Sequence, residues 1–163
     1  MGSSDSLALK GLFGALALCA SQLSAKQDCA IDRVLVKGDF GEARFTIELA
    51  DEPAERSQGL MDRESMPRSA GMLFVYEEPQ SASFWMRNTL IPLDMIFADR
   101  GGRVRHIHQN AIPHDETPIH GGTDIYAVLE INGGLSKKYG FQVGDALQHP
   151  AFFEGPPVIP CKE

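Results

Sequence analysis

Two carboxylates stand inside apolar stretches of the sequence, where an acidic residue needs a chemical or a structural reason to be. Asp94 lies in the stretch 93–98 and Glu130 in the stretch 126–131. An acid among apolar neighbours requires a partner or a solvated cleft, because burying an unpaired charge is expensive. Two carboxylates about 5–9.5 Å apart are also the machinery of glycoside hydrolysis. Asp94 and Glu130 are therefore candidates for a ligand pocket, a structural ion pair or a hydrolytic pair.

The residues near these acids in the sequence indicate what a pocket would contain. Trp85 and Tyr126 would supply aromatic walls, while arginines and an asparagine would supply hydrogen-bond donors to a small polar ligand. The structural alternative is a set of arginine–carboxylate pairs, including Arg56, that only stabilise the fold. The ligand-binding candidates are Arg63, Trp85, Arg87, Asn88, Asp94, Tyr126 and Glu130.

Four histidines form a second candidate site. His106 and His108 are two residues apart on an expected strand and so share a face, and His114 and His120 follow in a polar stretch. Imidazoles bind zinc or copper, and the methionine thioethers of the chain suit Cu(I). No compact ligand motif such as His-Glu-x-x-His or Cys-x-x-Cys accompanies them. The alternative is that the histidines are solvated and the methionines fill the core.

The sequence favours a binding module over an enzyme. It contains no nucleophile elbow, no P-loop and no dinucleotide fingerprint. We expect a small polar ligand or a protein partner, and no cofactor apart from a metal at the histidines. The alternatives are a hydrolase acting on a polar or sugar substrate through Asp94 and Glu130, and a copper or zinc protein.

The charge of the chain argues against two classes of partner. The 163 residues carry a formal net charge of −7. Nucleic acids are polyanions that bind basic surfaces with release of counterions, so we expect no nucleic-acid partner. Docking onto anionic lipid through charge is disfavoured for the same reason.

The first 25 residues have the pattern of a secretory signal peptide. Lys10 precedes the short apolar run 11–20, and small residues around Ala25 offer a cleavage site. The run is too short to span a membrane. A buried N-terminal helix is the alternative, and a lipoprotein anchored at Cys19 is disfavoured by the bulky Leu18 before it. The sequence therefore predicts a periplasmic or secreted protein without a transmembrane segment once the signal is removed.

Two cysteines remain after removal of the signal, one near each end of the mature chain. An exported protein with Cys29 and Cys161 most simply pairs them. In the chain-entropy model, a bridge that closes so long a loop stabilises the fold by roughly 4–5 kcal/mol at most. Two free thiols are the alternative.

Short strands separated by turn signals dominate the mature sequence. Residues 42–49 alternate strictly between apolar and polar, as a half-buried strand does. Asp51 is placed to cap a short helix that has Pro53 in its first turn and runs to about Leu60. A polar loop is expected over 110–125, and one helical turn over 134–139. The other expected strands are 72–76, 83–86, the hairpin 93–98 and 103–109, 126–131 and 146–148.

This pattern predicts a mostly β fold, a single-domain sandwich or barrel-like structure with one or two short helices. The β-rich domain is expected over residues 26–149, between the signal peptide at 1–25 and a proline-rich tail at 150–163.

Several strings resemble those of the family called domain of unknown function 192. They are Gly59-Leu-Met61 followed by Arg63, Gly71-Met-Leu-Phe74, Phe84-Trp-Met86 with Asn88-Thr89, Ile91-Pro-Leu-Asp94, Gly102, Tyr126, Leu129-Glu130, Gly134 and Gly144-Asp145. The resemblance covers roughly residues 34–148. It implies a compact β-rich fold, often exported, and implies no activity because the family has no established biochemical role. The loop 113–122 departs from the family pattern by carrying His114 and His120, so any role for them would belong to this protein.

Overall fold

The computed structural model describes residues 29–154 and 157–161. The predicted signal peptide lies outside these residues. Within them, no helix is both long enough and apolar enough to cross a membrane.

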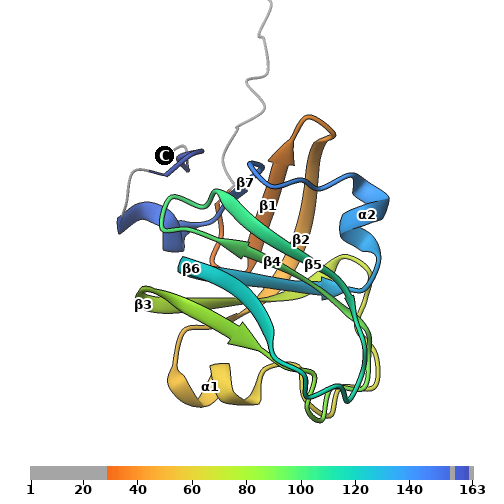
Figure 1. Cartoon of the computed structure of the whole chain (residues 1–163). Coiled ribbons are helices and arrows are strands. Elements are labelled where there is room, and N and C mark those ends of the chain that lie inside the picture. The colour runs from red at the N-terminus through yellow and green to blue at the C-terminus, as the bar shows by residue number, and fades with distance from the viewer. Residues whose placement is uncertain (1–28, 155–156, 162–163) are drawn as a thin grey trace, which may run out of the picture.

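One curled sheet of seven strands makes up most of the molecule (Figure 1). Two short α-helices and a 3-10 helix, η1 at Pro150–Glu154, complete the described chain. The prediction of a mostly β, barrel-like single domain with short helices is confirmed. In spatial order the strands are β5 (Val104–Ala111), β4 (Leu93–Ala98), β6 (Ile119–Asn132), β3 (Ala70–Phe84), β2 (Gly41–Ala50), β1 (Arg33–Gly38) and β7 (Ala146–Gln148).

The two edges of the sheet meet at one end, which gives the fold its barrel-like form. Arg103, just before β5, forms an antiparallel bridge with Ala146 of β7. The Val104 N–H donates to the Asp145 carbonyl at 2.8 Å, and the Leu147 N–H donates to the Gly102 carbonyl at 2.7 Å. Closure of this kind satisfies edge groups that would otherwise remain open to other chains.

A parallel pair of strands requires a crossover, and α1 (Pro53–Gln58) supplies it between β2 and β3. The helix begins at Glu52, which forms a capping box with Glu55. The expectation that Asp51 is the cap is therefore wrong by one residue. The reason is that Glu55 can return a hydrogen bond to the Glu52 N–H, at 3.2 Å.

Several element boundaries differ from those expected. The predicted strands 72–76 and 83–86 are one strand, β3, because register shifts at Val75, Gln80 and Ala82 carry the pairing with β6 through the polar segment. The loop that was expected over 110–125 spans only 112–118 in the structure, because β5 and β6 extend into the expected range from both sides. The strand β1 had no clear alternation in the sequence, since three consecutive residues from Val34 to Val36 are buried.

The curled sheet carries an apolar cluster on each face. The first cluster contains Val36, Phe45, Leu73 and Leu129, and α2 (Leu135–Tyr139) adds Leu135 to it. The second cluster contains four methionines together with aromatic and aliphatic residues, namely Met66, Met72, Met86, Met95, Phe74, Phe97, Leu60 and Val128. The helix α1 and the 85–92 segment lie on the side of the second cluster, where the candidate site is found.

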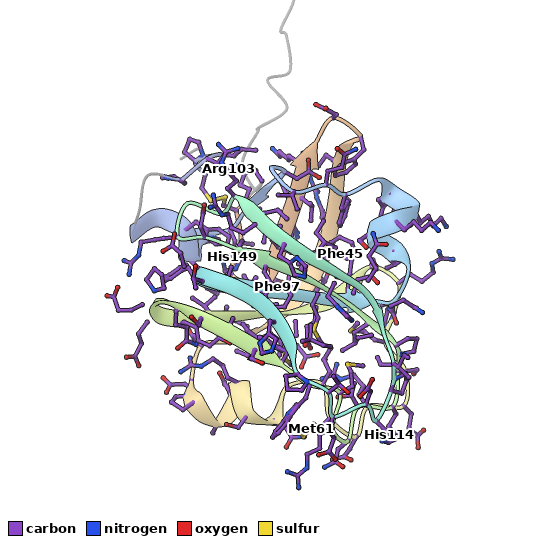
Figure 2. The ribbon with its side chains drawn as sticks, in the orientation of Figure 1. Phe45, Met61, Phe97, Arg103, His114 and His149 are labelled. Atoms are coloured by element: carbon purple, nitrogen blue, oxygen red, sulfur yellow. A yellow bond between two sulfur atoms is a disulfide. The ribbon has the colours of Figure 1, made fainter. Side chains whose placement is uncertain are left out.

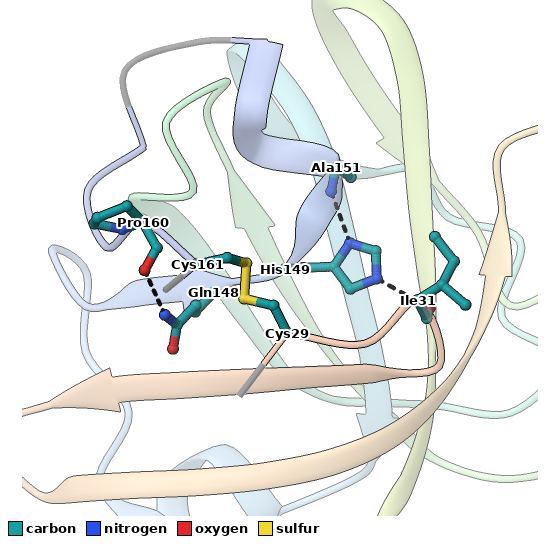
Figure 3. The surroundings of a disulfide bond; sticks show 7 residues. All are labelled: Cys29, Ile31, Gln148, His149, Ala151, Pro160 and Cys161. Carbon is teal, nitrogen blue, oxygen red and sulfur yellow. Dashed lines mark hydrogen bonds between the residues drawn. A yellow bond between two sulfur atoms is a disulfide. The ribbon is translucent and has the colours of Figure 1, made fainter. Parts of the chain in front are cut away.

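The predicted disulfide between Cys29 and Cys161 is present (Figure 3). The two Cα atoms are 5.5 Å apart, within the range that a disulfide spans. Beside it, the buried His149 accepts from the Ala151 N–H through Nδ1 and contacts the Ile31 carbonyl through Nε2 at 3.0 Å. Burial lowers the pKa of His149, which favours the neutral ring that this arrangement needs. The C-terminal tail is thus fastened to the segment before β1.

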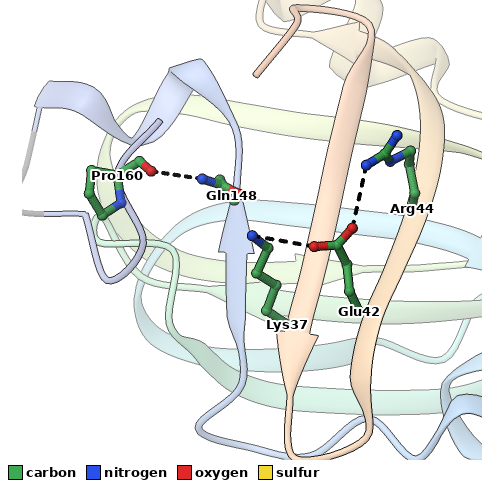
Figure 4. Close-up of polar contacts among 5 residues, drawn as sticks. All are labelled: Lys37, Glu42, Arg44, Gln148 and Pro160. Carbon is green, nitrogen blue, oxygen red and sulfur yellow. Dashed lines mark hydrogen bonds and ion pairs between the residues drawn. The ribbon is translucent and has the colours of Figure 1, made fainter. Parts of the chain in front are cut away.

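Ion pairs lie on the surface of the hairpin that β1 and β2 form (Figure 4). Glu42 lies 3.3 Å from Lys37 and 3.4 Å from Arg44. Exposed pairs of this kind contribute about 0–1 kcal/mol. Glu42 is therefore a suitable carboxylate to mutate as a control for the buried acids described below.

Candidate functional site

Strand register places the two candidate carboxylates on opposite faces of the sheet. Asp94 pairs with Ile131, whereas Glu130 pairs with Met95. Directly opposed residues of an antiparallel pair point to the same side, and successive residues alternate. Asp94 therefore points to the first cluster and Glu130 to the second. A hydrolytic pair needs both carboxylates at one cleft, so the paired-carboxylate hypothesis is wrong for these residues.

The carboxylate of Asp94 is fully engaged by the backbone. Its Oδ1 accepts from the N–H of Asn110 at 2.7 Å and of Gly134 at 2.8 Å, and its Oδ2 accepts from the N–H of Ser136 at 2.7 Å. The residue is 0% exposed. These bonds join the end of β5 to the turn that begins α2. Asp94 is thus a structural clamp, which corrects its assignment as a ligand-binding residue.

Glu130 is buried as Asp94 is, but backbone hydrogen bonds from the described residues do not hold its carboxyl. It is 4% exposed and lies between Met72 of β3 and Met95 of β4, and its carboxyl accepts no hydrogen bond from any described residue. Burial without a compensating partner raises the pKa of Glu130 to about 8. At neutral pH the carboxyl is therefore predominantly protonated. An acid of this kind, buried and open to a pocket, marks a candidate functional site.

A small pocket of about 50 Å³ opens above this carboxyl. Its walls come from α1, the turn that follows it, β3 and the segment after β3, and its floor comes from β6. The lining residues are Arg56, Ser57, Gln58, Gly59, Leu60, Met61, Phe74, Phe84, Trp85, Thr89 and Glu130. Figure 2 shows Met61 at this end of the molecule, away from His149 and Arg103. The pocket therefore lies far from the disulfide and the closed end of the sheet.

Strings that are distant in the sequence converge on this pocket. The turn Gly59-Leu-Met61, the last residue of Gly71-Met-Leu-Phe74, the start of Phe84-Trp-Met86, Thr89 and Glu130 all line it. Gly71 does not line the pocket but has a steric role next to it. A Cβ at this position would lie 2.5 Å from the Glu130 carbonyl oxygen. The small residue thus allows β3 to approach the strand that carries the acid.

The polar side chains around the rim are engaged within the protein. The Ser57 hydroxyl donates to the Pro53 carbonyl at 2.7 Å, and the Thr89 hydroxyl donates to the Arg87 carbonyl at 3.2 Å. The Arg56 guanidinium donates to the carbonyls of Asp51 and Val75. Glu130 is left as the one carboxyl among the lining residues.

Of the seven ligand-binding candidates, the structure brings Trp85 and Glu130 together at the pocket. Trp85 is 48% exposed and holds the Arg87 guanidinium over its ring at 5.7 Å. Asn88 lies in an exposed turn with φ of 52°, and its carbonyl accepts from the Asp62 N–H. Arg63 lies in a separate groove, where it forms a two-bond ion pair with Glu48 at 2.5 and 2.9 Å.

Tyr126 was expected to supply an aromatic wall together with Trp85, but it does not line the pocket above Glu130. The ring packs in the first cluster beside Phe152, while Val128 belongs to the second. The irregular pairing of β3 with β6 between Val75 and Gln80 interrupts the alternation there. Tyr126 thus lines a different depression on the surface.

Sequence reasoning missed the part of the pocket that α1 and Thr89 contribute. Arg56 was considered only as an ion-pair partner. The available signal was the Gly59-Leu-Met61 string, which follows directly on the predicted helix and contributes three lining residues.

The four candidate metal ligands are divided among three places. His106 and His108 share a face as predicted, and His106 packs against Phe97 with ring centroids 5.6 Å apart. Burial and then the neighbouring His108 lower the pKa of His106. His108 and His120 line one groove, whereas His114 occupies an exposed turn. In the part of the chain that the structure describes, no three His, Cys, Asp or Glu side chains converge to hold a metal ion.

Two solved structures resemble most of this chain. A protein of unknown function from Novosphingobium aromaticivorans DSM 12444 is 41% identical, with a TM-score of 0.70 over 85% of this chain and 99% of that one. A protein from Sinorhizobium meliloti 1021, described as a proposed transcription regulator, is also 41% identical, with a TM-score of 0.70 over 75% of this chain and 95% of that one. No curated protein matches the sequence.

The family comparison covers the same region as the sheet and the pocket. The family DUF192, described as "Uncharacterized ACR", matches residues 35–149. This range contains every residue that lines the pocket above Glu130. The protein is therefore a member of the DUF192 family, whose function is uncharacterised.

Proposed function

We propose that this protein is a binding module that receives the end group of a small ligand, or of a partner segment, in the pocket above Glu130. The observation that carries the proposal is the carboxyl of Glu130, which is 4% exposed, lines a pocket with aromatic walls and accepts no hydrogen bond from the described residues. A buried polar group without a partner costs free energy, and a ligand that hydrogen-bonds to it recovers that cost. We therefore attribute the presence of this buried carboxyl to ligand recognition rather than to a contribution to folding stability.

The composition of the pocket favours binding over catalysis. Glu130 is the one carboxyl among the lining residues, which include no histidine and no cysteine. General acid–base and nucleophilic mechanisms use a second positioned group. The hydroxyls of Ser57 and Thr89 donate to backbone carbonyls and not to a general base in the described part of the chain.

The disulfide supports action outside the cytoplasm. A bridge between Cys29 and Cys161 persists in oxidising compartments and is rare in the cytosol. The signal-peptide pattern at residues 1–25 points the same way. We therefore propose that the binding function is exercised in the periplasm or the extracellular space.

Protein-observed NMR with four-carbon fragments tests the proposal. The fragments end in an amine, an alcohol, an amide or a carboxylate, and the reporters are the amides of residues 57–61, 84–89 and 129–131. Trp85 is the only tryptophan in the chain, so its indole signal is unique. We expect at least one fragment to give saturable shifts confined to these residues.

A matched pair of variants controls the experiment. Trp85→Ala removes a wall of the pocket, whereas Tyr139→Ala removes an exposed aromatic ring on α2, against the first cluster. The expected result is that Trp85→Ala weakens fragment binding at least about fivefold, a loss of about 1 kcal/mol, and that Tyr139→Ala leaves it unchanged. If no fragment shifts the pocket residues, the proposed function is wrong.

A further inference from the structure

We propose that the end group received by the pocket is a primary ammonium, either of a free amine or of a lysine side chain. The inference rests on the proposed function and specifies its ligand. Three features carry it: the nature of the walls, the direction in which the rim hydrogen bonds point, and the size of the pocket.

The walls combine aromatic rings with a single acid. Phe74 and Phe84 meet edge to face with centroids 5.2 Å apart, and Trp85 completes the wall at the surface. Aromatic rings attract cations through the negative potential of their faces. An anionic ligand would instead meet the carboxyl of Glu130 at the floor. The aromatic faces and the carboxyl favour a positively charged ligand, while Arg56, the one cation among the lining residues, directs its guanidinium to backbone carbonyls.

The side-chain donors of Ser57, Gln58 and Thr89 at the rim are engaged within the protein. The hydroxyl hydrogens of Ser57 and Thr89 point to backbone carbonyls, and the Gln58 amide donates to the Met61 carbonyl at 3.5 Å. Glu130 offers two carboxylate oxygens once it ionises. An ammonium has three donors and no acceptor, so it complements such a site better than a hydroxyl or an amide does.

The size of the pocket restricts the ligand to a small end group. Its volume of about 50 Å³ holds one or two water molecules, since each occupies about 30 Å³ in the liquid. An –NH₃⁺ group fits this space, whereas a whole sugar ring does not. The remainder of the ligand would lie beside the exposed Trp85 ring, over which the Arg87 guanidinium also lies.

The charged groups around the pocket are compatible with a cation. Arg56 on α1 packs over the Tyr76 ring, with its guanidinium directed to backbone carbonyls. Tyr76 on β3 is a titratable group close enough to interact with Glu130. On the neighbouring strands, Met72 and Met95 are neutral, and His108 lies one strand further on. The net charge of −7 attracts cations at long range.

NMR titration with n-butylammonium, at constant ionic strength between about pH 6 and pH 9, tests the inference. The ammonium must bind the ionised form of Glu130, so binding displaces the carboxyl proton. Because the pKa of Glu130 is about 8, the apparent affinity should rise roughly tenfold per pH unit well below pH 8 and level off above it. n-Butanol should bind at least about tenfold more weakly at pH 8.5, since it lacks the charge.

Two carboxylate variants separate recognition from general electrostatics. Glu130→Gln should lower the affinity for n-butylammonium at least about tenfold at pH 8.5 and abolish its pH dependence. Glu42→Gln removes the same charge from an exposed site and should change neither. If butanol or butyrate binds the same residues more tightly than the amine, the ammonium inference fails while the binding function stands. If no fragment binds, both fail.

A third comparison distinguishes the two sources of the ammonium. A short peptide with blocked ends and one lysine is titrated beside n-butylammonium, with its acetyl-lysine form as the control. Tighter binding of the peptide identifies a polypeptide partner, and equal or weaker binding identifies a free amine. Binding of the acetylated peptide with undiminished affinity would overturn the inference.

Discussion

Replacing Asp94 with alanine is expected to destabilise the protein by about 3–5 kcal/mol. The variant removes an acceptor of three backbone hydrogen bonds, from the N–H groups of Asn110, Gly134 and Ser136. The Ser136 donor would be left buried and those of Asn110 and Gly134 part-buried, and each unsatisfied buried donor costs about 1–3 kcal/mol. Asp94→Asn should cost less, because it keeps one acceptor oxygen, but its amide group faces donors rather than acceptors.

Denaturant unfolding followed by Trp85 fluorescence measures this effect. Asp39→Ala, in the exposed turn between β1 and β2, is the control and should change stability by less than about 1 kcal/mol. A loss of less than about 1 kcal/mol for Asp94→Ala would contradict the role of this residue as a structural clamp. It would also reopen the assignment of Asp94 to a ligand site.

Replacing Glu130 with glutamine is expected to stabilise the protein at alkaline pH and to have little effect near pH 4.5. The folded state holds the pKa of Glu130 at about 8, against 4.5 for the ordinary group. Between these values the unfolded chain releases a proton that the folded protein retains. The free energy of unfolding of the wild type therefore falls as pH rises from about 4.5 to about 8, by at most roughly 4–5 kcal/mol.

The variant removes this dependence because glutamine does not titrate. Denaturant unfolding at about pH 5, 6.5 and 8 should show the stabilities of the wild type and Glu130→Gln diverging steadily, with the variant the more stable. Glu42→Gln should follow the wild type at all three pH values. A wild type as stable as the variant at pH 8 would show that Glu130 carries no burial penalty and would remove the observation that supports the pocket proposal.

Local patterns in the sequence were sufficient for most of the strands. Strict alternation in 42–49 predicts β2, because one face of that strand is buried and the other is solvated. The apolar run 93–98 and the turn after it predict the β4–β5 hairpin. The buried run in β1 and the bulged middle of β3 lack a period of two, so their boundaries could not be read in this way.

The candidate site could be predicted only in part, because the register of the strand pairing decides which side chains share a face of the sheet. Asp94 and Glu130 look alike in the sequence, an acid in an apolar strand, yet the pairing of Asp94 with Ile131 sends them to opposite faces. The Asp94 carboxylate accepts hydrogen bonds from three backbone N–H groups, whereas Glu130 lines a pocket. Arg56 and Thr89 reach that pocket through the placement of α1 and of the segment after β3, which depends on long-range packing.

The protonation state of Glu130 is the most direct test of the account. Carbon-13 NMR of the side-chain carboxyl, assigned by its absence in Glu130→Gln, would follow the titration of this single group with and without n-butylammonium. The account predicts a midpoint near pH 8 in the free protein and a lower midpoint when the amine is bound. A midpoint between about pH 4 and 5 in the free protein, as for an exposed glutamate, would contradict it.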